Sequence, residues 1–306
     1  MRLRELAPGE VRAALRGPGL ALHVPPVTVR IRGDVPSFAA QLRLLYGSHE
    51  TRAAQDFADV DVRMIPGRGV RRVVRRTVDF VIDGITPFEP FPLDHALPMF
   101  EWGLNWAFAQ RTQRFLLLHS AVVARDDRAV LLPAWPGSGK STLAASLAAR
   151  GWRYLSDEFG VVVPGTLRIL PFPRPAALKN QSIEVLRHFA PGATIGPAFP
   201  GTRKGTVAHF APPEASVEMA GRAARIALVV FPDFVADAPL TVQAMGPSAA
   251  FLKLAHNAFN YEDVGEDAFH TVAAIVRSTP FHILRYHDLD SAHRAIGDLL
   301  DARGRA

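Results

Sequence analysis

Residues 129–142 read Ala-Val-Leu-Leu-Pro-Ala-Trp-Pro-Gly-Ser-Gly-Lys-Ser-Thr, and they are the most informative stretch of the chain. The apolar run that ends at Pro133 is typical of a buried strand, and the Ala- and Leu-rich residues 141–150, closed by Gly151, are typical of a helix. Between them lies the pattern G-x-x-x-x-G-K-[ST], with Ala134 at the first glycine. We interpret this segment as a phosphate-binding P-loop between a strand and a helix, which predicts an α/β fold.

The residue types of this loop suit phosphate chemistry. Small residues let backbone N–H groups approach phosphate oxygens, and the start of a helix adds partial positive charge. We expect Lys140 to reach the β- and γ-phosphates and the Ser141 hydroxyl to bind Mg²⁺. The alternative is a chance glycine turn before a helix. The candidate ATP-binding residues are Pro136, Gly137, Ser138, Gly139, Lys140, Ser141 and Thr142.

Two adjacent carboxylates, Asp157 and Glu158, follow the loop after one helix and one short strand. Because this connection is short, the chain returns directly beside the loop. We therefore expect both side chains to lie near the γ-phosphate and to bind Mg²⁺ there. Adjacent residues on a strand point to opposite faces, so both act together only if the strand ends before Asp157. The alternative is a surface turn with solvated acids.

Three short segments accompany the P-loop: His119-Ser120-Ala121, Arg150-Gly151-Trp152 and Ser156-Asp157-Glu158. Through these segments and the P-loop the chain resembles bacterial HPr kinase/phosphorylase and, more closely, the HPr kinase-related kinases of type A, and the resemblance is best between residues 115 and 183. It implies a P-loop core similar to that of phosphoenolpyruvate carboxykinase, with ATP and Mg²⁺ as cofactors.

The resemblance also implies roles for individual residues. Asp157 matches the general base that takes the proton of the acceptor hydroxyl, and Glu158 stands where a second Asp would help to hold Mg²⁺. His119 matches a histidine near the phosphates, although a buried core histidine is the alternative. With Lys140, these are the candidate catalytic residues.

Two later segments, residues 173–180 and 201–209, resemble the related-kinase group. The Glu-Ile-Arg-Gly segment of HPr kinase is not found in this sequence. Its absence leaves open which residue is the second metal ligand, whether the reverse reaction that removes phosphate occurs, and whether HPr is the acceptor. Only four of the 35 basic residues are lysine, and three of them fall in the P-loop and these segments. A lysine kept in an arginine-rich chain indicates a need for a compact point charge. The candidate substrate or phosphate contacts in these segments are Lys179, Asn180, Arg203, Lys204 and His209. The alternative for Lys179, Arg203 and Lys204 is a solvated position on an exposed loop, and for His209 it is a structural histidine.

Composition excludes several other classes of function. The 306 residues include no cysteine, which excludes disulfide scaffolds, cysteine nucleophiles, zinc fingers and iron–sulfur clusters. We find no apolar run of about 18 residues and no signal-peptide core, so we expect a cytoplasmic protein without a membrane partner. The net charge of +6 comes mostly from arginine, and the basic run 68–76 contains no aromatic residue. We interpret that run as the solvated face of a strand or hairpin and expect no nucleic-acid partner.

The chain divides into an N-terminal α+β region, residues 1–113, which we expect to select the acceptor, and a P-loop kinase core, residues 114–306. In the first part the patterns predict strands at 27–32, 60–64 and 78–83 and helices at 36–47 and 94–113. In the second part they predict strands at 115–118, 121–124, 129–132, 152–155, 159–163, 226–231 and 281–286, and helices at 141–150, 248–260, 266–278 and 291–302, with a loop-rich stretch at 164–213.

We expect an ATP- and Mg²⁺-dependent kinase that phosphorylates a hydroxyl, most simply a serine, on a small protein or peptide. Two alternatives are an ATPase or GTPase switch, whose acceptor is water, and a nucleotide-binding sensor without turnover. A homo-oligomer is consistent with the hexameric relatives in the family.

Overall fold

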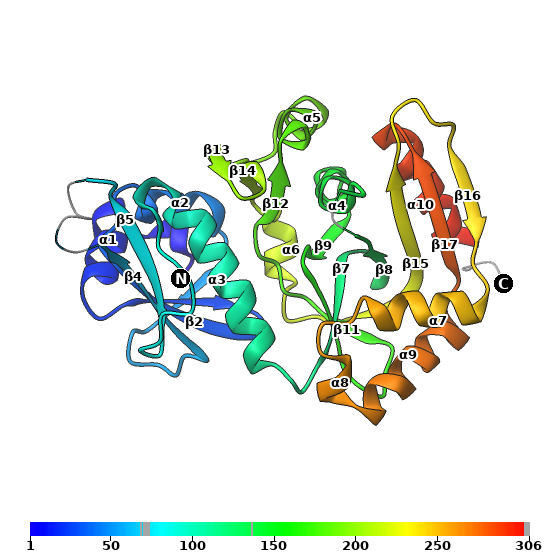
Figure 1. The fold of residues 1–306 in the computed structure, drawn as a ribbon, viewed down its shortest axis with the longest axis horizontal. Coiled ribbons are helices and arrows are strands. Elements are labelled where there is room, and N and C mark those ends of the chain that lie inside the picture. Colours follow the sequence, from blue (N-terminus) through cyan, green and yellow to red (C-terminus); the bar gives the residue numbers. More distant parts are fainter. Residues whose placement is uncertain (68, 70–73, 136, 303–306) are drawn as a thin grey trace.

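The computed structural model describes residues 1–67, 69, 74–135 and 137–302. It is a mixed α/β structure with three sheets, of six, eight and three strands. In Figure 1 the six-stranded sheet lies at the left, the eight-stranded sheet at the right, and the three-stranded sheet above and between them.

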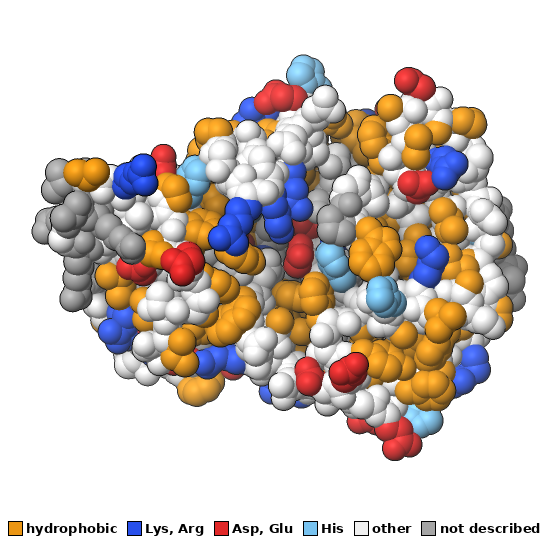
Figure 2. All heavy atoms as spheres, in the orientation of Figure 1, with side chains coloured by type: hydrophobic (Ala, Val, Ile, Leu, Met, Phe, Trp, Pro, Cys, Tyr) orange, Lys and Arg blue, Asp and Glu red, His pale blue; other side chains and the backbone are white. Residues whose placement is uncertain are grey.

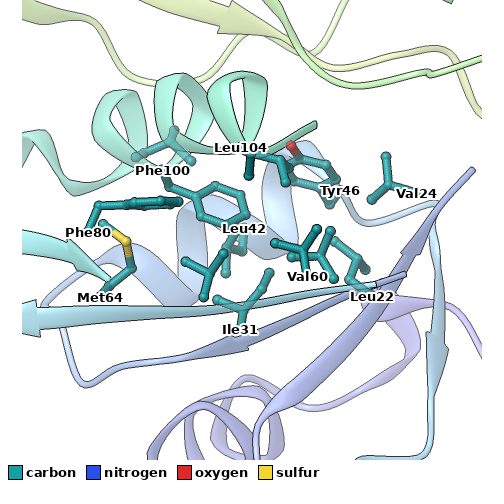
Figure 3. Packing of buried hydrophobic residues seen from close by; sticks show 14 of the residues in the cluster. Leu22, Val24, Ile31, Leu42, Tyr46, Val60, Met64, Phe80, Phe100 and Leu104 are labelled. Atoms are coloured by element: carbon teal, nitrogen blue, oxygen red, sulfur yellow. The ribbon is translucent and has the colours of Figure 1, made fainter. Parts of the chain in front are cut away.

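The six-stranded sheet has the order β3-β1-β2-β4-β5-β6, and only the β2–β4 pairing is parallel. Residues of β5 alternate between half-buried and buried, as a strand with one covered face requires. Figure 3 shows Leu42 of α2 and Phe100 of α3 packing over sheet residues such as Ile31. The elements of this part are α1 (Pro8–Arg16), β1 (Leu20–Val24), β2 (Val27–Arg32), α2 (Phe38–Leu45), β3 (Glu50–Arg52), β4 (Val60–Pro66), β5 (Thr77–Ile82), β6 (Phe91–Pro92) and α3 (Ala96–Arg111), with short 3₁₀ turns at Leu3–Glu5 and Leu93–His95.

The eight-stranded sheet has the order β11-β10-β7-β8-β15-β17-β16, and β9 pairs with β7 beside this path. The strands β8, β15 and β17 run parallel, whereas β7 is antiparallel to all three of its partners. Apolar residues of α4 and α10 cover one face of the sheet, and those of α7 and α9 cover the other. The elements are β7 (Leu116–Arg125), β8 (Arg128–Pro133), α4 (Lys140–Ala149), β9 (Arg153–Ser156), β10 (Phe159–Val162), β11 (Arg168–Leu170), α6 (Glu214–Glu218), β15 (Ala224–Phe234), β16 (Thr241–Ala244), α7 (Pro247–His256), α8 (Tyr261–Val264), α9 (Glu266–Ser278), β17 (Phe281–Tyr286) and α10 (Leu289–Ala302).

The stretch predicted to be loop-rich, residues 164–213, contains regular structure instead. Besides β11 it forms β12 (Ala176–Lys179), α5 (Gln181–Phe189), β13 (Phe199–Thr202) and β14 (Gly205–Phe210), and β12, β14 and β13 make the three-stranded sheet. These strands are short, and β12 pairs with β14 about 30 residues further along the chain. A local pattern of apolar and polar residues therefore does not predict them. The two apolar runs 115–118 and 121–124 likewise form one strand, β7, rather than two.

Other differences concern single elements. The helix α1 and the strands β1, β3 and β16 have no counterpart in the sequence-based assignment. The predicted helix 94–113 is confirmed as α3, and its residues Phe100, Leu104 and Phe108 are fully or almost fully buried. Of the basic run 68–76, residues 68 and 70–73 lie outside the described part of the chain, and Arg75 and Arg76 are exposed.

The two parts of the chain share one hydrophobic cluster. Phe108 of α3 stacks on Phe172 at a ring distance of 4.0 Å and lies 5.7 Å from Phe159 of β10. The division into regions 1–113 and 114–306, and the acceptor-selecting role of the first, stay predictions. Among the residues that the structure describes, no helix has both the length and the apolar character needed to cross a membrane.

A buried ion pair joins the same two parts. Arg174, in the segment before β12, lies 2.6 Å from the Glu101 carboxylate of α3, and both side chains are less than a tenth exposed. The Tyr46 hydroxyl donates to the other oxygen of Glu101 at 2.6 Å, and Arg174 also donates to the Glu101 carbonyl at 2.9 Å. The Tyr154 hydroxyl of β9 donates to the Arg174 carbonyl at 3.0 Å, so this network reaches the strand that leads to Asp157.

We expect Glu101→Ala to lower the free energy of unfolding by about 3–5 kcal/mol, because it leaves the Arg174 guanidinium buried without a counter-ion. Urea unfolding measures the loss. The control is Glu184→Ala, which breaks the exposed pair with Arg187 on α5 and should cost less than about 1 kcal/mol. Equal, small losses in both variants would contradict the structural role of the buried pair.

Candidate functional site

The loop between β8 and α4 has the backbone geometry that its glycines allow. Gly137 and Gly139 have φ angles of 94° and 84°, in the region that favours glycine. A Cβ atom at Gly139 would lie 2.5 Å from the Tyr286 hydroxyl, so the space itself also requires glycine there. The predicted strand–loop–helix order is confirmed, and the candidate Pro136 lies outside the described residues.

Polar groups are buried at this loop without partners. Lys140, the first residue of α4, is 8% exposed, and its ammonium group has no hydrogen-bond partner among the described residues. The hydroxyl groups of Ser138 and Ser156 are also buried and unpaired. A buried charge without a hydrogen-bond partner is costly, and the start of α4 adds the partial positive charge of a helix N-terminus. These groups fit an anionic ligand such as a phosphate chain.

Asp157 and Glu158 lie in the turn between β9 and β10, because β9 ends at Ser156 and β10 begins at Phe159. The condition for both carboxylates to reach the loop is therefore met. Asp157 is 7% exposed, and one of its oxygens accepts the Ala177 N–H of β12 at 3.3 Å while the other has no partner among the described residues. Burial raises the pKa of Asp157, and the nearby Lys140 charge opposes this shift only in part.

Glu158 faces His119 from β7, with 3.7 Å between its carboxylate and the imidazole Nε2. Burial, together with the Lys140 charge, lowers the pKa of His119 to about 4, so this ring is neutral at physiological pH. Burial also acts to raise the pKa of Glu158, but the Lys140 charge and other nearby cations outweigh it and the net shift is downward. Glu158 is therefore an ionised carboxylate beside a neutral imidazole.

Two lysines from the three-stranded sheet approach this group. Lys179 is the last residue of β12, and Lys204 lies in the turn between β13 and β14. Burial lowers the pKa of Lys179, and the Lys204 charge lowers it further against the opposing effect of Glu158. Figure 2 shows blue, red and pale blue side chains close together near the middle of this face. The site therefore combines cations and carboxylates from four separate stretches of the chain, at Lys140, Asp157–Glu158, Lys179 and Lys204.

The remaining candidates are placed differently. Arg203 is exposed. The Asn180 side chain accepts a hydrogen bond from the Thr206 N–H at 3.0 Å, which links the end of β12 to its partner strand β14. His209 is 3% exposed, and the charged groups that act on its pKa are Glu101 and Arg174 rather than the site lysines. Burial lowers the pKa of His209. We assign His209 to the interior and not to the loop cluster.

Sequence reasoning left out three features of the site. Ser156 has no role among the sequence candidates because the burial of its hydroxyl group depends on packing between distant segments. The Ala177 N–H has none because backbone donors leave no trace in residue types. The third is Trp135, which is 60% exposed although it stands within the motif itself. An exposed tryptophan in a phosphate-binding pattern is the signal that could have drawn attention to it.

Comparison with known proteins shows a distant structural similarity. A scan against protein-family models finds no match, and a search of curated proteins also finds none. Among solved structures, the HPr(Ser) kinase/phosphatase from Coxiella burnetii is similar over 61% of this chain and 95% of that chain, at 11% identity and a TM-score of 0.25. At that TM-score we derive the function from this chain's own residues.

We expect Asp157→Asn to raise the free energy of unfolding near pH 7 in the absence of nucleotide and metal. Because the pKa of Asp157 is raised by burial, the folded state favours the protonated form, and the ionised carboxylate costs stability above that pKa. The advantage of the variant should shrink as the pH falls through the folded-state pKa and vanish below the usual aspartate range.

Urea unfolding at a series of pH values measures this difference. The matched control is Asp126→Asn in the β7–β8 turn, where the aspartate side chain is 81% exposed and no such change is expected. A variant at position 157 that is less stable than the wild type at pH 7 would contradict the prediction.

Proposed function

We propose that the protein is an ATP- and Mg²⁺-dependent kinase that phosphorylates a hydroxyl, most simply a serine, on a small protein or peptide. The observation that carries this proposal is the buried Lys140 ammonium, which has no hydrogen-bond partner among the described residues and lies near Asp157 and Glu158. A cation for phosphate and a carboxylate for the acceptor are the two parts that phosphoryl transfer requires.

The loop and the start of α4 would bind the phosphates. The candidates are Gly137 to Thr142, with Lys140 reaching the β- and γ-phosphates and the Ser138 hydroxyl donating a further hydrogen bond. Both groups are buried and unpaired in the structure, so the ligand would satisfy them.

The same site has the oxygen ligands that Mg²⁺ prefers, in Ser141, Asp157 and Glu158. Among the described residues no group of three or more His, Asp or Glu could hold a metal ion alone. Mg²⁺ is usually bound by one or two carboxylates together with substrate phosphates, so we expect these residues to hold the ion jointly with the nucleotide. When bound, the ion would neutralise charge on the phosphate oxygens.

Asp157 would act as the general base. Its unpaired oxygen would take the proton of the acceptor hydroxyl while the hydroxyl oxygen forms a bond to the γ-phosphorus. The bond between the γ-phosphorus and the β–γ bridging oxygen breaks, and ADP leaves with that bridging oxygen. The Ala177 N–H holds the other carboxylate oxygen and so orients the base. The raised pKa of Asp157 strengthens it as a proton acceptor, provided that it is ionised. Lys179 and Lys204 would balance charge on the transferred group.

The test uses γ-labelled ATP and Mg²⁺, with and without a fraction of small proteins and peptides from the source cells. A discrete labelled acceptor that is absent with Lys140→Ala supports the kinase. Label that appears only as free phosphate would favour the ATPase or GTPase switch, and ATP binding without any transfer would favour the sensor.

We expect Asp157→Asn to lower kcat by about 10²- to 10⁴-fold, the usual contribution of a general base, because Asn cannot take the proton. Affinity for ATP should change little, since Lys140 and the loop remain. Kinase rates and equilibrium ATP binding measure the two effects separately, with Asp126→Asn as the control. Equal losses of binding and transfer would overturn the assignment of Asp157 as the base.

A further inference from the structure

An exposed aromatic ring, Phe234, lies on the side of the loop away from the carboxylates. In the sheet the loop strand β8 lies between β7 and β15. His119 is on β7, and Asp157 and Glu158 follow β9, which also pairs with β7. Phe234 is the last residue of β15, on the opposite flank of β8.

Backbone and ring contacts hold Phe234 against the loop. Its N–H donates to the Ser138 carbonyl at 3.2 Å, and its Cβ lies 3.1 Å from where a Cβ of Gly139 would be. Its ring meets the buried Tyr286 ring edge-on at 5.7 Å. The Phe234 side chain is nevertheless 47% exposed, so an ordered aromatic surface is open to solvent directly beside the phosphate-binding loop.

The direction of a bound nucleotide follows from the placement of the carboxylates. If the γ-phosphate points towards Asp157 and Glu158, on the β7 side, the α-phosphate and the nucleoside leave the loop towards β15. The flat face of a nucleobase stacks well on an aromatic side chain, and such stacking is tolerant of base identity.

We propose that Phe234 is the surface on which the base of the nucleotide stacks. This inference rests on the proposed function, because it takes its direction from the transfer site. Stacking uses the ring face that all bases share, so ATP and GTP should depend on Phe234 alike, whereas inorganic tripolyphosphate, which has no base, should not.

Trp135 provides the matched comparison. It is also exposed and also adjoins the loop, but its ring packs 5.3 Å from His256 at the end of α7. The next residue, Asn257, accepts the His119 N–H through its carbonyl at 2.6 Å. Trp135 therefore lies towards the β7 side of the loop, where the γ-phosphate and the acceptor would be, and not where the base would be.

The experiment measures Kd for Mg²⁺-ATP, Mg²⁺-GTP and Mg²⁺-tripolyphosphate with the wild type, Phe234→Ala, Phe234→Trp and Trp135→Ala. Phe234→Ala should weaken both nucleotides by at least about fivefold and change tripolyphosphate by less than about twofold. Phe234→Trp should keep nucleotide affinity, and Trp135→Ala should leave the ratio of ATP to tripolyphosphate affinity unchanged. Urea unfolding of each variant confirms that it folds.

Three results would overturn the inference alone, with the kinase intact: Phe234→Ala weakens all three ligands equally, it weakens none, or Trp135→Ala changes the ratio instead. The first would mean that Phe234 only supports the loop. A wild type that binds neither ATP nor tripolyphosphate would overturn the proposed function together with the inference, so the two failures are distinguishable.

Discussion

Main-chain pairing along β7 is the constraint on which the rest of the site depends. Its ten residues pair with β8, β9 and β10. The registers set Ser120 opposite Pro133 and His119 opposite Phe159, so the end of the loop strand and the carboxylate turn come to the same place. A shift of one residue in this register would turn every side chain of the strand to the other face and separate these groups.

The site that this pairing assembles costs stability. Lys140 and Asp157 are buried with polar atoms unpaired, and burial disfavours the ionised form of Asp157. The Glu101–Arg174 pair joins α3 to the segment before β12, and β12 supplies the N–H that holds Asp157. Groups arranged for a ligand commonly reduce the stability of the free protein in this way. Glu101 of α3 thus contacts the segment that leads to the Asp157 site, although residues 1–113 provide none of the candidate catalytic residues.

The sequence predicted well those features that depend on neighbouring residues. The strand, loop and helix around Lys140 follow from an apolar run, small residues and an Ala- and Leu-rich stretch, all within about 20 positions. Asp157 and Glu158 follow closely enough that their return to the loop could be argued from connection length. The three-stranded sheet was not predicted because its strands are short and pair with distant partners. Residue types alone also left open whether His209, which is buried, is a structural histidine or a site residue.

Residue types and their spacing thus specify the α/β class, the phosphate-binding pattern and the pair of carboxylates, because each is encoded within a short segment. The burial of Lys140 without a partner, the shifted pKa of Asp157, the approach of Lys179 and the exposure of Phe234 beside the loop depend on packing between segments far apart in the chain. Desolvation and Coulomb interactions act through space and not along the sequence, so these properties exist only once the sheets have assembled.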